Sequence, residues 1–337
     1  MIDLRSDTVT KPTTGMLEAM MSAEVGDDVF ESDPTVNKLQ ERLAGMFGMD
    51  AALYCPSGTM SNQIAFRVAT RPQDEVICDK RSHIYLYEGG GLAYNSMLSP
   101  KLLDGDRGRL TADMISSNIN PPDDVHCPRT SIVGLENTVN KGGGCFYDLN
   151  EIKAIRKVCD EHDLHLHLDG ARLFNALVET EEQPSEYGTL FNTISICFSK
   201  GLGAPVGSVL LGSKVQIKEA KRVRKVLGGG MRQVGYLAAA CIYALDNHVD
   251  RLKEDHVRAR VLGEEMAKKG FVDEVLPVET NIVISELTNI TPKQLLAKFE
   301  QSGLHAVAFG PQAVRFVTHL NFDDNQLDQA VDIIRRL

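Results

Sequence analysis

The stretch LHLHLDGAR at residues 164–172 decides how the fold of this chain is interpreted. It alternates apolar and polar residues and then breaks at Asp169-Gly170, as expected for a strand that ends in a turn. A second apolar stretch, TISICFSKG at residues 193–201, ends in Lys200 in the same way. Ligands of doubly wound sheets bind beyond the carboxyl ends of the strands, so Asp169 and Lys200 are predicted to border one crevice.

Similar apolar runs recur from about residue 50 to residue 213, separated by turn residues and by segments with helical periodicity. The predicted strands are residues 51–55, 75–78, 131–136, 165–168, 193–198 and 207–211. Strands this apolar favour a mostly parallel sheet that is covered by helices on both faces. The predicted fold class is therefore α/β.

The pattern changes after residues 234–269, a helical stretch that is predicted to join two parts of the chain. The elements expected after it are strands near residues 281–285 and 313–318 and helices at residues 292–302 and 324–336. We therefore expect a large α/β domain over residues 1–249, which includes the N-terminal segment. A small α+β domain is expected over residues 250–337.

Composition excludes several classes of protein. The 337 residues are 43% hydrophobic, which is enough for a sizeable core, yet no apolar run approaches the roughly 20 residues that a membrane span needs. The N-terminus is charged from Asp3 onward and lacks the apolar centre of a signal peptide, so we expect a soluble, cytoplasmic protein. The net charge of −10 and the dispersed basic residues argue against a nucleic-acid partner. Seven scattered cysteines without a CxxC pair indicate reduced thiols.

Three further patterns have both a functional and a structural interpretation. Ser57, Gly58 and Thr59 follow a predicted strand and begin a helix, which suits a phosphate, although serine and threonine also cap helices for structural reasons. His165 and His167 precede Asp169 with the alternation of a metal site, but packing beneath the crevice is favoured. The basic stretch at residues 214–232 is interpreted as a solvated helix face.

Three strand ends, which lead to Ser57, Asp169 and Lys200, together supply what a pyridoxal phosphate site requires. These parts are phosphate donors, an acid for the pyridine nitrogen and a lysine for the Schiff base. At these residues the sequence resembles the L-threonine aldolases of the fold-type-I pyridoxal phosphate enzymes. The likeness extends over nearly the whole chain and is carried by LRSDTVT (4–10), VGDDV (25–29), PSGTMSNQ (56–63), DGAR (169–172), SKG (199–201) and LGGGMRQ (227–233).

This resemblance implies that a small amino acid, L-threonine or L-allo-threonine, is cleaved to glycine and acetaldehyde. It implies a Schiff base between Lys200 and pyridoxal 5'-phosphate, with Asp169 at the pyridine nitrogen. The other implied cofactor contacts are Ser57, Gly58 and Thr59 at the phosphate, His83 on the ring, Arg172, and Lys225 and Arg232 from a neighbouring subunit. The implied substrate contacts are Ser6, Arg172 and Arg315 at the carboxylate and His126 at the β-hydroxyl. No metal is implied, and the family is typically a homotetramer with sites between subunits.

Several alternatives stay open at this point. Either His83 or His126 can take the hydroxyl proton, directly or through a water. The chain has Phe30 where the family usually has tyrosine, so the choice between threonine and allo-threonine is not predicted. Other possibilities are β-elimination or transamination on the same scaffold, or a catalytically silent binding protein.

Overall fold

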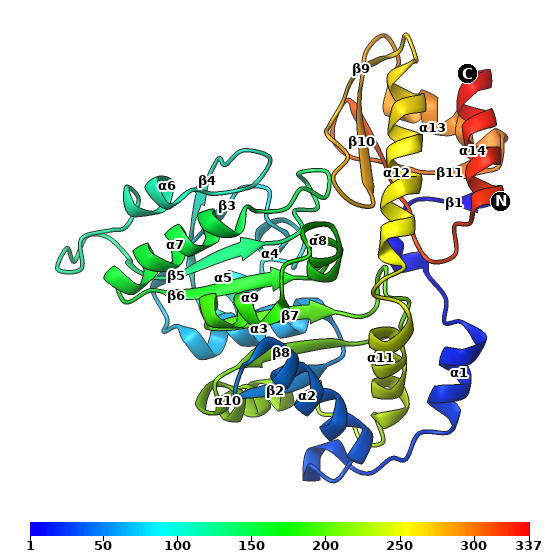
Figure 1. Ribbon diagram of the computed structural model, residues 1–337. Coiled ribbons are helices and arrows are strands. Elements are labelled where there is room, and N and C mark those ends of the chain that lie inside the picture. Colours follow the sequence, from blue (N-terminus) through cyan, green and yellow to red (C-terminus); the bar gives the residue numbers. More distant parts are fainter.

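The structure, a computed structural model, describes residues 1–337 and shows a large α/β part followed by a smaller C-terminal part (Figure 1). The large part contains a seven-stranded sheet with the order β2-β8-β7-β6-β5-β3-β4. Its strands are β2 (Ala51–Cys55), β3 (Asp74–Asp79), β4 (Ser99–Leu103), β5 (Arg129–Glu136), β6 (His165–Gly170), β7 (Thr193–Cys197) and β8 (Ser208–Gly212). Every neighbouring pair is parallel except the two pairs that β8 makes. The predicted mostly parallel α/β sheet is confirmed.

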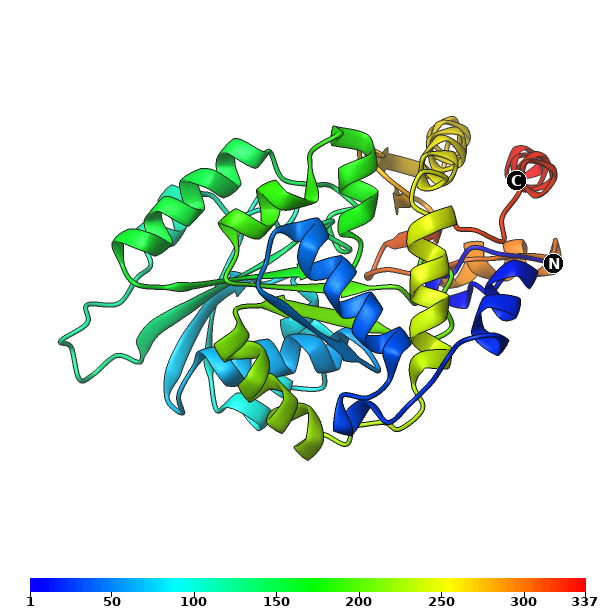
Figure 2. The same ribbon diagram turned by 60° about the horizontal axis from the view of Figure 1, so that its bottom comes forward.

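Helices cover both faces of this sheet (Figure 2). The helices α3 (Gly58–Ala69), α5 (Gly91–Ser96) and α10 (Lys214–Val226) lie on one face, and α2 (Pro34–Phe47), α7 (Leu149–Glu161) and α9 (Pro184–Leu190) lie on the other. Between the layers, strands β5, β6 and β7 are almost entirely buried, and the polar side chains that alternate with leucine in β6 are buried as well. The edge strand β4 is partly exposed and contains Pro100 and Lys101, so the sequence pattern did not reveal it.

The large part is completed by α1 (Thr14–Met21), α4 (His83–Leu86), α6 (Ala112–Ser116), α8 (Leu173–Thr180) and α11 (Gly235–Asn247). Short 3-10 helices at Asp7–Val9 and Asp28–Phe30 flank α1. Helix α1 packs against α11, and α11 also packs against α2. None of the helices in the chain has the length and apolar composition that crossing a membrane requires.

The smaller part is built around a four-stranded antiparallel sheet with the order β12-β13-β10-β9. Its strands are β9 (Val272–Val275), β10 (Ile282–Leu287), β12 (Val307–Ala308) and β13 (Ala313–Val317), and its helices are α12 (Leu252–Ala267), α13 (Pro292–Gln301) and α14 (Asp324–Arg336). The N-terminal strand β1 (Ile2–Asp3) pairs in parallel with β11 (Leu304–His305). Ile2 and Leu4 thereby join the hydrophobic cluster of the smaller part, while the domain boundary near residue 250 stays a prediction.

The stretch at residues 234–269 is two helices rather than the one that its helical pattern suggested. Helix α11 ends at Asn247 and α12 begins at Leu252. Between them, the His248 ring contacts the backbone oxygen of Leu202 at 2.7 Å and lies edge-on to Tyr243. These tertiary contacts fix His248 at the junction, and no periodicity along a single helix encodes them.

The solvated-face interpretation of the basic stretch at residues 214–232 is wrong for Arg224. Its side chain is buried on α10 and forms an ion pair with Asp28 at 2.7 Å. The same guanidinium donates to the backbone oxygen of Tyr54 at 2.6 Å. Lys221 and Arg232 pair with neighbouring acids, Glu31 and Asp27, so this stretch holds the acidic segment 27–31 in place.

Asp33 ties three separate segments together through its buried carboxylate. One oxygen caps α2 by accepting from the backbone N–H groups of Thr35 and Val36, each at 3.1 Å. The other accepts from Gly26 at 3.2 Å and from Gly235, at the start of α11, at 2.9 Å. A single side chain thus satisfies four backbone donors that have no helical partner.

We expect Asp33→Ala to lower the free energy of unfolding by at least about 2 kcal/mol, because it removes a helix cap and leaves buried donors without an acceptor. Urea unfolding followed by circular dichroism measures the change. Thr111→Ala is the matched control, because it removes an exposed cap from the short helix α6 and should cost about 1 kcal/mol or less. Equal losses in the two variants would show that Asp33 acts only as a local cap.

Candidate active site

The strand ends singled out in the sequence do lie at one edge of the large sheet. β2 and β7 both run antiparallel to β8, and β7 runs parallel to β6, so these three strands point in the same direction. Asp169 near the end of β6 lies beside Ser195 of β7. Lys200 follows β7 after a short turn, and α3 begins just after β2. The ends of β2, β6 and β7 therefore lie at one edge of the sheet, as the sequence predicts, while a crevice that Asp169 and Lys200 share stays a prediction.

Helix α3 fixes the orientation of Asp169. The amide nitrogen of Asn62 donates to the buried Asp169 carboxylate at 2.9 Å, and the amide oxygen of Asn62 lies 3.1 Å from a ring nitrogen of His167. The other Asp169 oxygen accepts from the backbone N–H of Ala171 at 3.1 Å. The Asp169 carboxylate is thus held by two hydrogen bonds, one to each oxygen, at the edge of the sheet.

The two histidines of β6 support the site from beneath. Their rings share the hydroxyl of Thr193 at 2.9 Å each. Burial lowers the pKa of His165 to about 3 and that of His167 to about 4, so both rings are neutral at ordinary pH. Their ring nitrogens have partners within the protein, in agreement with packing rather than metal binding.

The start of α3 and Lys200 meet at Cys197. The Lys200 amine lies 3.4 Å from the Cys197 sulfur. A Cβ atom on residue 58 would lie only 2.4 Å from the same sulfur, so only glycine lets the helix approach this closely. The helix start, with the hydroxyls of Ser57 and Thr59 at the surface, is therefore held next to the lysine. This arrangement fits a phosphate group attached to a lysine-bound cofactor.

Arg172 is engaged by a carboxylate of the N-terminal segment. Its guanidinium forms two hydrogen bonds of 2.7 Å with Asp7, and both side chains are buried. Burial alone would raise the pKa of Asp7, but Arg172 outweighs it and lowers that pKa to about 2. The two charges therefore neutralise one another. Ser6 caps the short helix that contains Asp7, which places it beside this ion pair.

Arg315 of β13 has no acidic partner. Its terminal nitrogens donate to the Asn140 side chain at 2.8 Å and to the Arg5 backbone oxygen at 2.9 Å. Its Nε is buried without any partner. Burial and the nearby Arg172 charge lower the pKa of Arg315 to about 10, which still leaves it positive at neutral pH. A cation with an unsatisfied donor is a natural binding group for a carboxylate.

His83 at the start of α4 lies against two buried glutamates. Its Nδ1 is 3.1 Å from Glu88, and its backbone N–H donates to Glu136 at 2.7 Å. Burial favours the neutral ring, but the hydrogen bond to Glu88 and the charges of Asp169 and Glu136 outweigh it and raise the pKa of His83. Glu88 therefore holds one nitrogen of the ring and leaves Nε2 available for chemistry.

Ligand atoms of His83, Glu88 and Asp169 lie within 4.8 Å of one another, which is close enough to surround a metal ion. However, the Asn62 amide nitrogen donates to both carboxylates, at 2.9 Å each. A second amide, from Gln63, donates to the other oxygen of Glu88 at 2.6 Å. These donors satisfy the two acids without a cation, so the cluster suits hydrogen bonding better than metal binding.

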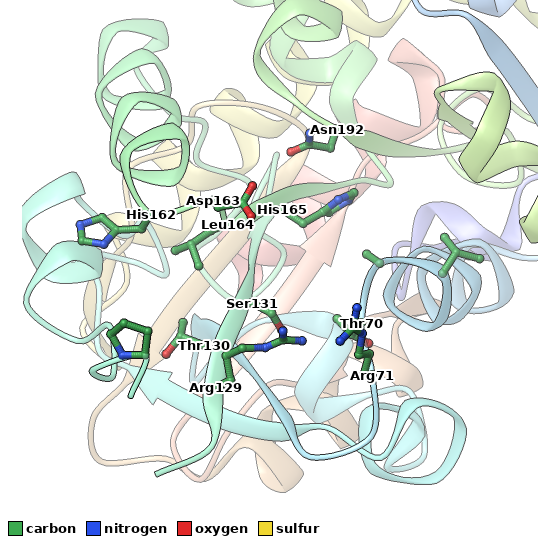
Figure 3. A pocket seen from close by; sticks show the side chains of 13 residues that line it. Thr70, Arg71, Arg129, Thr130, Ser131, His162, Asp163, Leu164, His165 and Asn192 are labelled. Carbon is green, nitrogen blue, oxygen red and sulfur yellow. The ribbon is translucent and has the colours of Figure 1, made fainter. Parts of the chain in front are cut away.

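His126 lies far from the site within its own chain. It is exposed in the loop that precedes β5, whereas Glu136 at the other end of β5 adjoins His83. A cavity of about 680 Å³ lies beside that loop, at the beginnings of β5 and β6, and Figure 3 shows Arg129 and His165 among its lining residues. No residue predicted for the site lines this cavity.

Lys225 and Arg232 are exposed at the end of α10 and in the loop that follows it. Between them, Gly229 packs so closely against Met60 that a Cβ atom would lie 2.3 Å from the methionine sulfur. The loop is therefore next to the first turn of α3, and Arg232 pairs with Asp27 at 2.9 Å. The roles of both residues at a cofactor phosphate stay predictions.

Sequence reasoning missed Asp7, Asn62, Glu88, Asn140 and Glu136. Asp7 and Asn62 lie inside motifs that the sequence did single out, next to Ser6 and Thr59. Glu88 and Glu136 follow apolar stretches, and a charged residue in such a position is a weak signal of a buried partner. Only the fold shows that they converge on His83.

Comparisons with known proteins place this geometry in a family. Residues 3–289 match the family described as β-eliminating lyase. The low specificity L-threonine aldolase of Escherichia coli K12 is 42% identical over 329 residues, which are 97% of this chain and 96% of that protein. The low-specificity L-threonine aldolase 1 of Arabidopsis thaliana is 39% identical over 94% of this chain and 91% of its own. The chain belongs to the threonine aldolase family.

Solved structures of this family share the fold. The threonine aldolase of Leishmania major has a TM-score of 0.86 at 21% identity and covers 100% of this chain and 99% of its own. An L-allo-threonine aldolase candidate from Listeria monocytogenes has a TM-score of 0.82 at 22% identity and covers 99% of this chain and 96% of its own. Both structures match nearly the whole of this chain, and the fold-type-I architecture is confirmed.

Glu136 offers a test of the site's electrostatics. Burial, followed by the charge of Asp169, raises its pKa from the ordinary 4.5 to about 7. Between these values the folded protein binds more protons than the unfolded chain, so the free energy of unfolding falls as pH rises through this window. We expect Glu136→Gln to lack this fall, because the amide does not titrate.

Urea unfolding of both proteins between about pH 5 and pH 7.5 measures the difference. Glu264→Gln, at an exposed position on α12, is the matched control and should keep the pH dependence of the original protein. If the free energy of unfolding changed with pH equally in the original protein and in Glu136→Gln, Glu136 would not be protonated in the folded state at these pH values.

Proposed function

We propose that this protein is a pyridoxal phosphate-dependent L-threonine aldolase that cleaves L-threonine and L-allo-threonine to glycine and acetaldehyde. The observation that carries the proposal is the meeting of Lys200 with the start of α3 at Cys197, in a crevice that also contains Asp169. Relatives named as threonine aldolases match nearly the entire chain, which supports the substrate class.

Bound pyridoxal phosphate supplies an electron sink for the electrons of the broken Cα–Cβ bond. Lys200 is the residue that we propose to carry it covalently. Ser57, Gly58 and Thr59 would bind its phosphate through N–H groups at the start of α3 and the hydroxyls of Ser57 and Thr59. Asp169 is the acid for the pyridine nitrogen, and the hydrogen bonds that Asn62 and Ala171 donate to its carboxylate hold it in place.

The substrate is oriented by its carboxylate. Arg315 offers its unpartnered Nε, and Arg172, already neutralised by Asp7, presents its remaining donors beside Ser6. One net positive charge therefore faces one carboxylate, which places Cα and Cβ of the amino acid between Arg315 and His83. A bidentate or forked contact of this kind fixes direction as well as position.

A histidine accepts the proton of the β-hydroxyl while the Cα–Cβ bond breaks. Within one chain His83 is the available residue, because Glu88 holds its Nδ1 and leaves Nε2 free. His126 reaches the site only from another subunit, since its own chain places it beyond the opposite end of β5.

β-Elimination is the second candidate, favoured by the description of the matching family. The two reactions give different products from threonine. Aldol cleavage gives acetaldehyde and glycine, whereas β-elimination of water gives 2-oxobutyrate and ammonia. We expect acetaldehyde and glycine in equal amounts when the protein, loaded with pyridoxal phosphate, is incubated with L-threonine.

We expect Lys200→Ala to remove the visible absorbance of the lysine-bound cofactor and nearly all release of acetaldehyde, because Lys200 is the amine that we propose to hold the cofactor covalently. The far-ultraviolet circular dichroism spectrum should not change. Lys214→Ala, at an exposed lysine on α10, is the control for general loss of charge. A Lys200→Ala protein that turns over at the original rate would refute the proposed role.

We also propose a cytoplasmic homo-oligomer, a tetramer whose sites are shared between subunits. Three predicted site residues, Lys225, Arg232 and His126, are exposed and make no contact with Lys200 in their own chain. Apolar side chains are exposed close to two of them, with Phe30 77% and Val226 85% exposed. Such residues are expected at a surface that another subunit covers.

Complementation between two inactive variants tests whether subunits share their active sites. An Arg232→Glu chain keeps Lys200 but damages the site of its neighbour, and a Lys200→Ala chain has the reverse defect. We expect mixed oligomers, formed by unfolding and reassembly together, to regain part of the acetaldehyde release, because some sites combine Lys200 and Arg232 from different chains. If mixed oligomers form but show only the sum of the two residual activities, Arg232 serves its own chain or no site.

A further inference from the structure

A cleft of about 410 Å³ lies between the two parts of the chain, outside the crevice of Lys200. Lys80, Arg81 and Lys141 line it from the large part, and Phe309 and Glu286 line it from the small part. The cleft therefore has three cations and one carboxylate, although the whole chain has a net charge of −10. A positive cleft on an acidic protein is an electrostatic feature that attracts anions.

Lys141 differs from the other two cations of this cleft. Lys80 and Arg81 both pair with Asp104, at 2.7 and 3.2 Å. The half-buried Lys141 pairs with no carboxylate, and its amine lies over the ring of Phe309 at 4.2 Å and 5.9 Å from the ring centre of Tyr87. The two aromatic faces hold the ammonium in place and leave its charge without a counter-ion.

The position of Lys141 links both ends of the proposed substrate site. The Tyr87 ring is 5.6 Å from the ring of His83, and the Phe309 ring is 4.4 Å from the guanidinium carbon of Arg315. The preceding residue in the chain, Asn140, accepts the hydrogen bond from Arg315. Lys141 therefore lies between Arg315, the proposed carboxylate anchor, and His83, on the side of the cleft.

We propose that Lys141 is a specificity-determining residue that binds an anionic group on the β-substituent of the substrate. The inference rests on the proposed function, in which Cα and Cβ lie between Arg315 and His83, and it adds a substrate class: β-hydroxy amino acids with a second carboxylate. For 3-hydroxyaspartate, the Cα–Cβ bond breaks, the hydroxyl proton leaves, and a proton is added at Cα. The products are glycine and glyoxylate, with no oxidant or reductant consumed.

The test compares kcat/KM for 3-hydroxyaspartate with kcat/KM for threonine in the full-length protein loaded with pyridoxal phosphate. We expect Lys141→Met to lower this ratio at least about tenfold, the effect of losing one charge-assisted contact. Lys80→Met is the matched control, because it removes a lysine of the same cleft whose charge is already paired, and it should leave the ratio unchanged. An unchanged ratio in Lys141→Met would overturn the inference.

A binding measurement separates this inference from the proposed function. Aspartate and alanine share the amino acid head group but lack the β-hydroxyl, so neither is a substrate for aldol cleavage. Calorimetric titration should show that Lys141→Met weakens the binding of aspartate at least about tenfold more than the binding of alanine. If the affinities for aspartate and alanine fall equally, Lys141 merely supports Arg315 and the inference is wrong. Failure to cleave threonine would refute the proposed function alone, since the two affinities still decide the role of Lys141.

Discussion

The amide of Asn62 is the contact on which the site depends most. From one position on α3, it donates to two buried carboxylates, Glu88 and Asp169, and accepts from His167. Two carboxylates that share one donor keep both hydrogen bonds only if that donor does not move. On the same helix, Ser61 bonds to Ser195 and to a serine of β8, which anchors α3 to the sheet. The start of the helix and Asp169 therefore keep a fixed separation.

A second constraint is the balance of charge around the substrate. Asp7 and Arg172 cancel one another, so the uncompensated cation is Arg315, which Asn140 and a backbone oxygen hold without neutralising. A buried cation without an acid is costly in an isolated chain, and a bound carboxylate removes that cost. The smaller part of the chain carries Arg315 on β13, while Asn140 belongs to the large part. In the proposed complex, a substrate carboxylate at Arg315 therefore also joins the two parts of the chain.

The sequence predicted the features that depend on local pattern. The strands around Asp169 and Lys200, their common edge and the helix start at Gly58 all follow from apolar runs and turn residues. It could not predict the break at His248, which depends on a backbone oxygen of Leu202, or the burial of Arg224 against Asp28. Glu88 and Asn62 were missed for the same reason, because their partners come together only when distant segments pack.

Two motifs far apart in the sequence, residues 25–29 and 227–233, act as one unit. Asp27 and Asp28 of the motif at residues 25–29 pair with Arg232 and Arg224, and the backbone N–H of Asp28 donates to the Arg232 oxygen at 3.1 Å. Of these two ion pairs, the buried one fixes the backbone, since a lone charge would be costly there. The exposed pair contributes little to stability and leaves the Arg232 side chain able to exchange its partner. An arginine that is held by its backbone and whose exposed guanidinium can exchange Asp27 for another anion suits the proposed contact with a phosphate in a second chain.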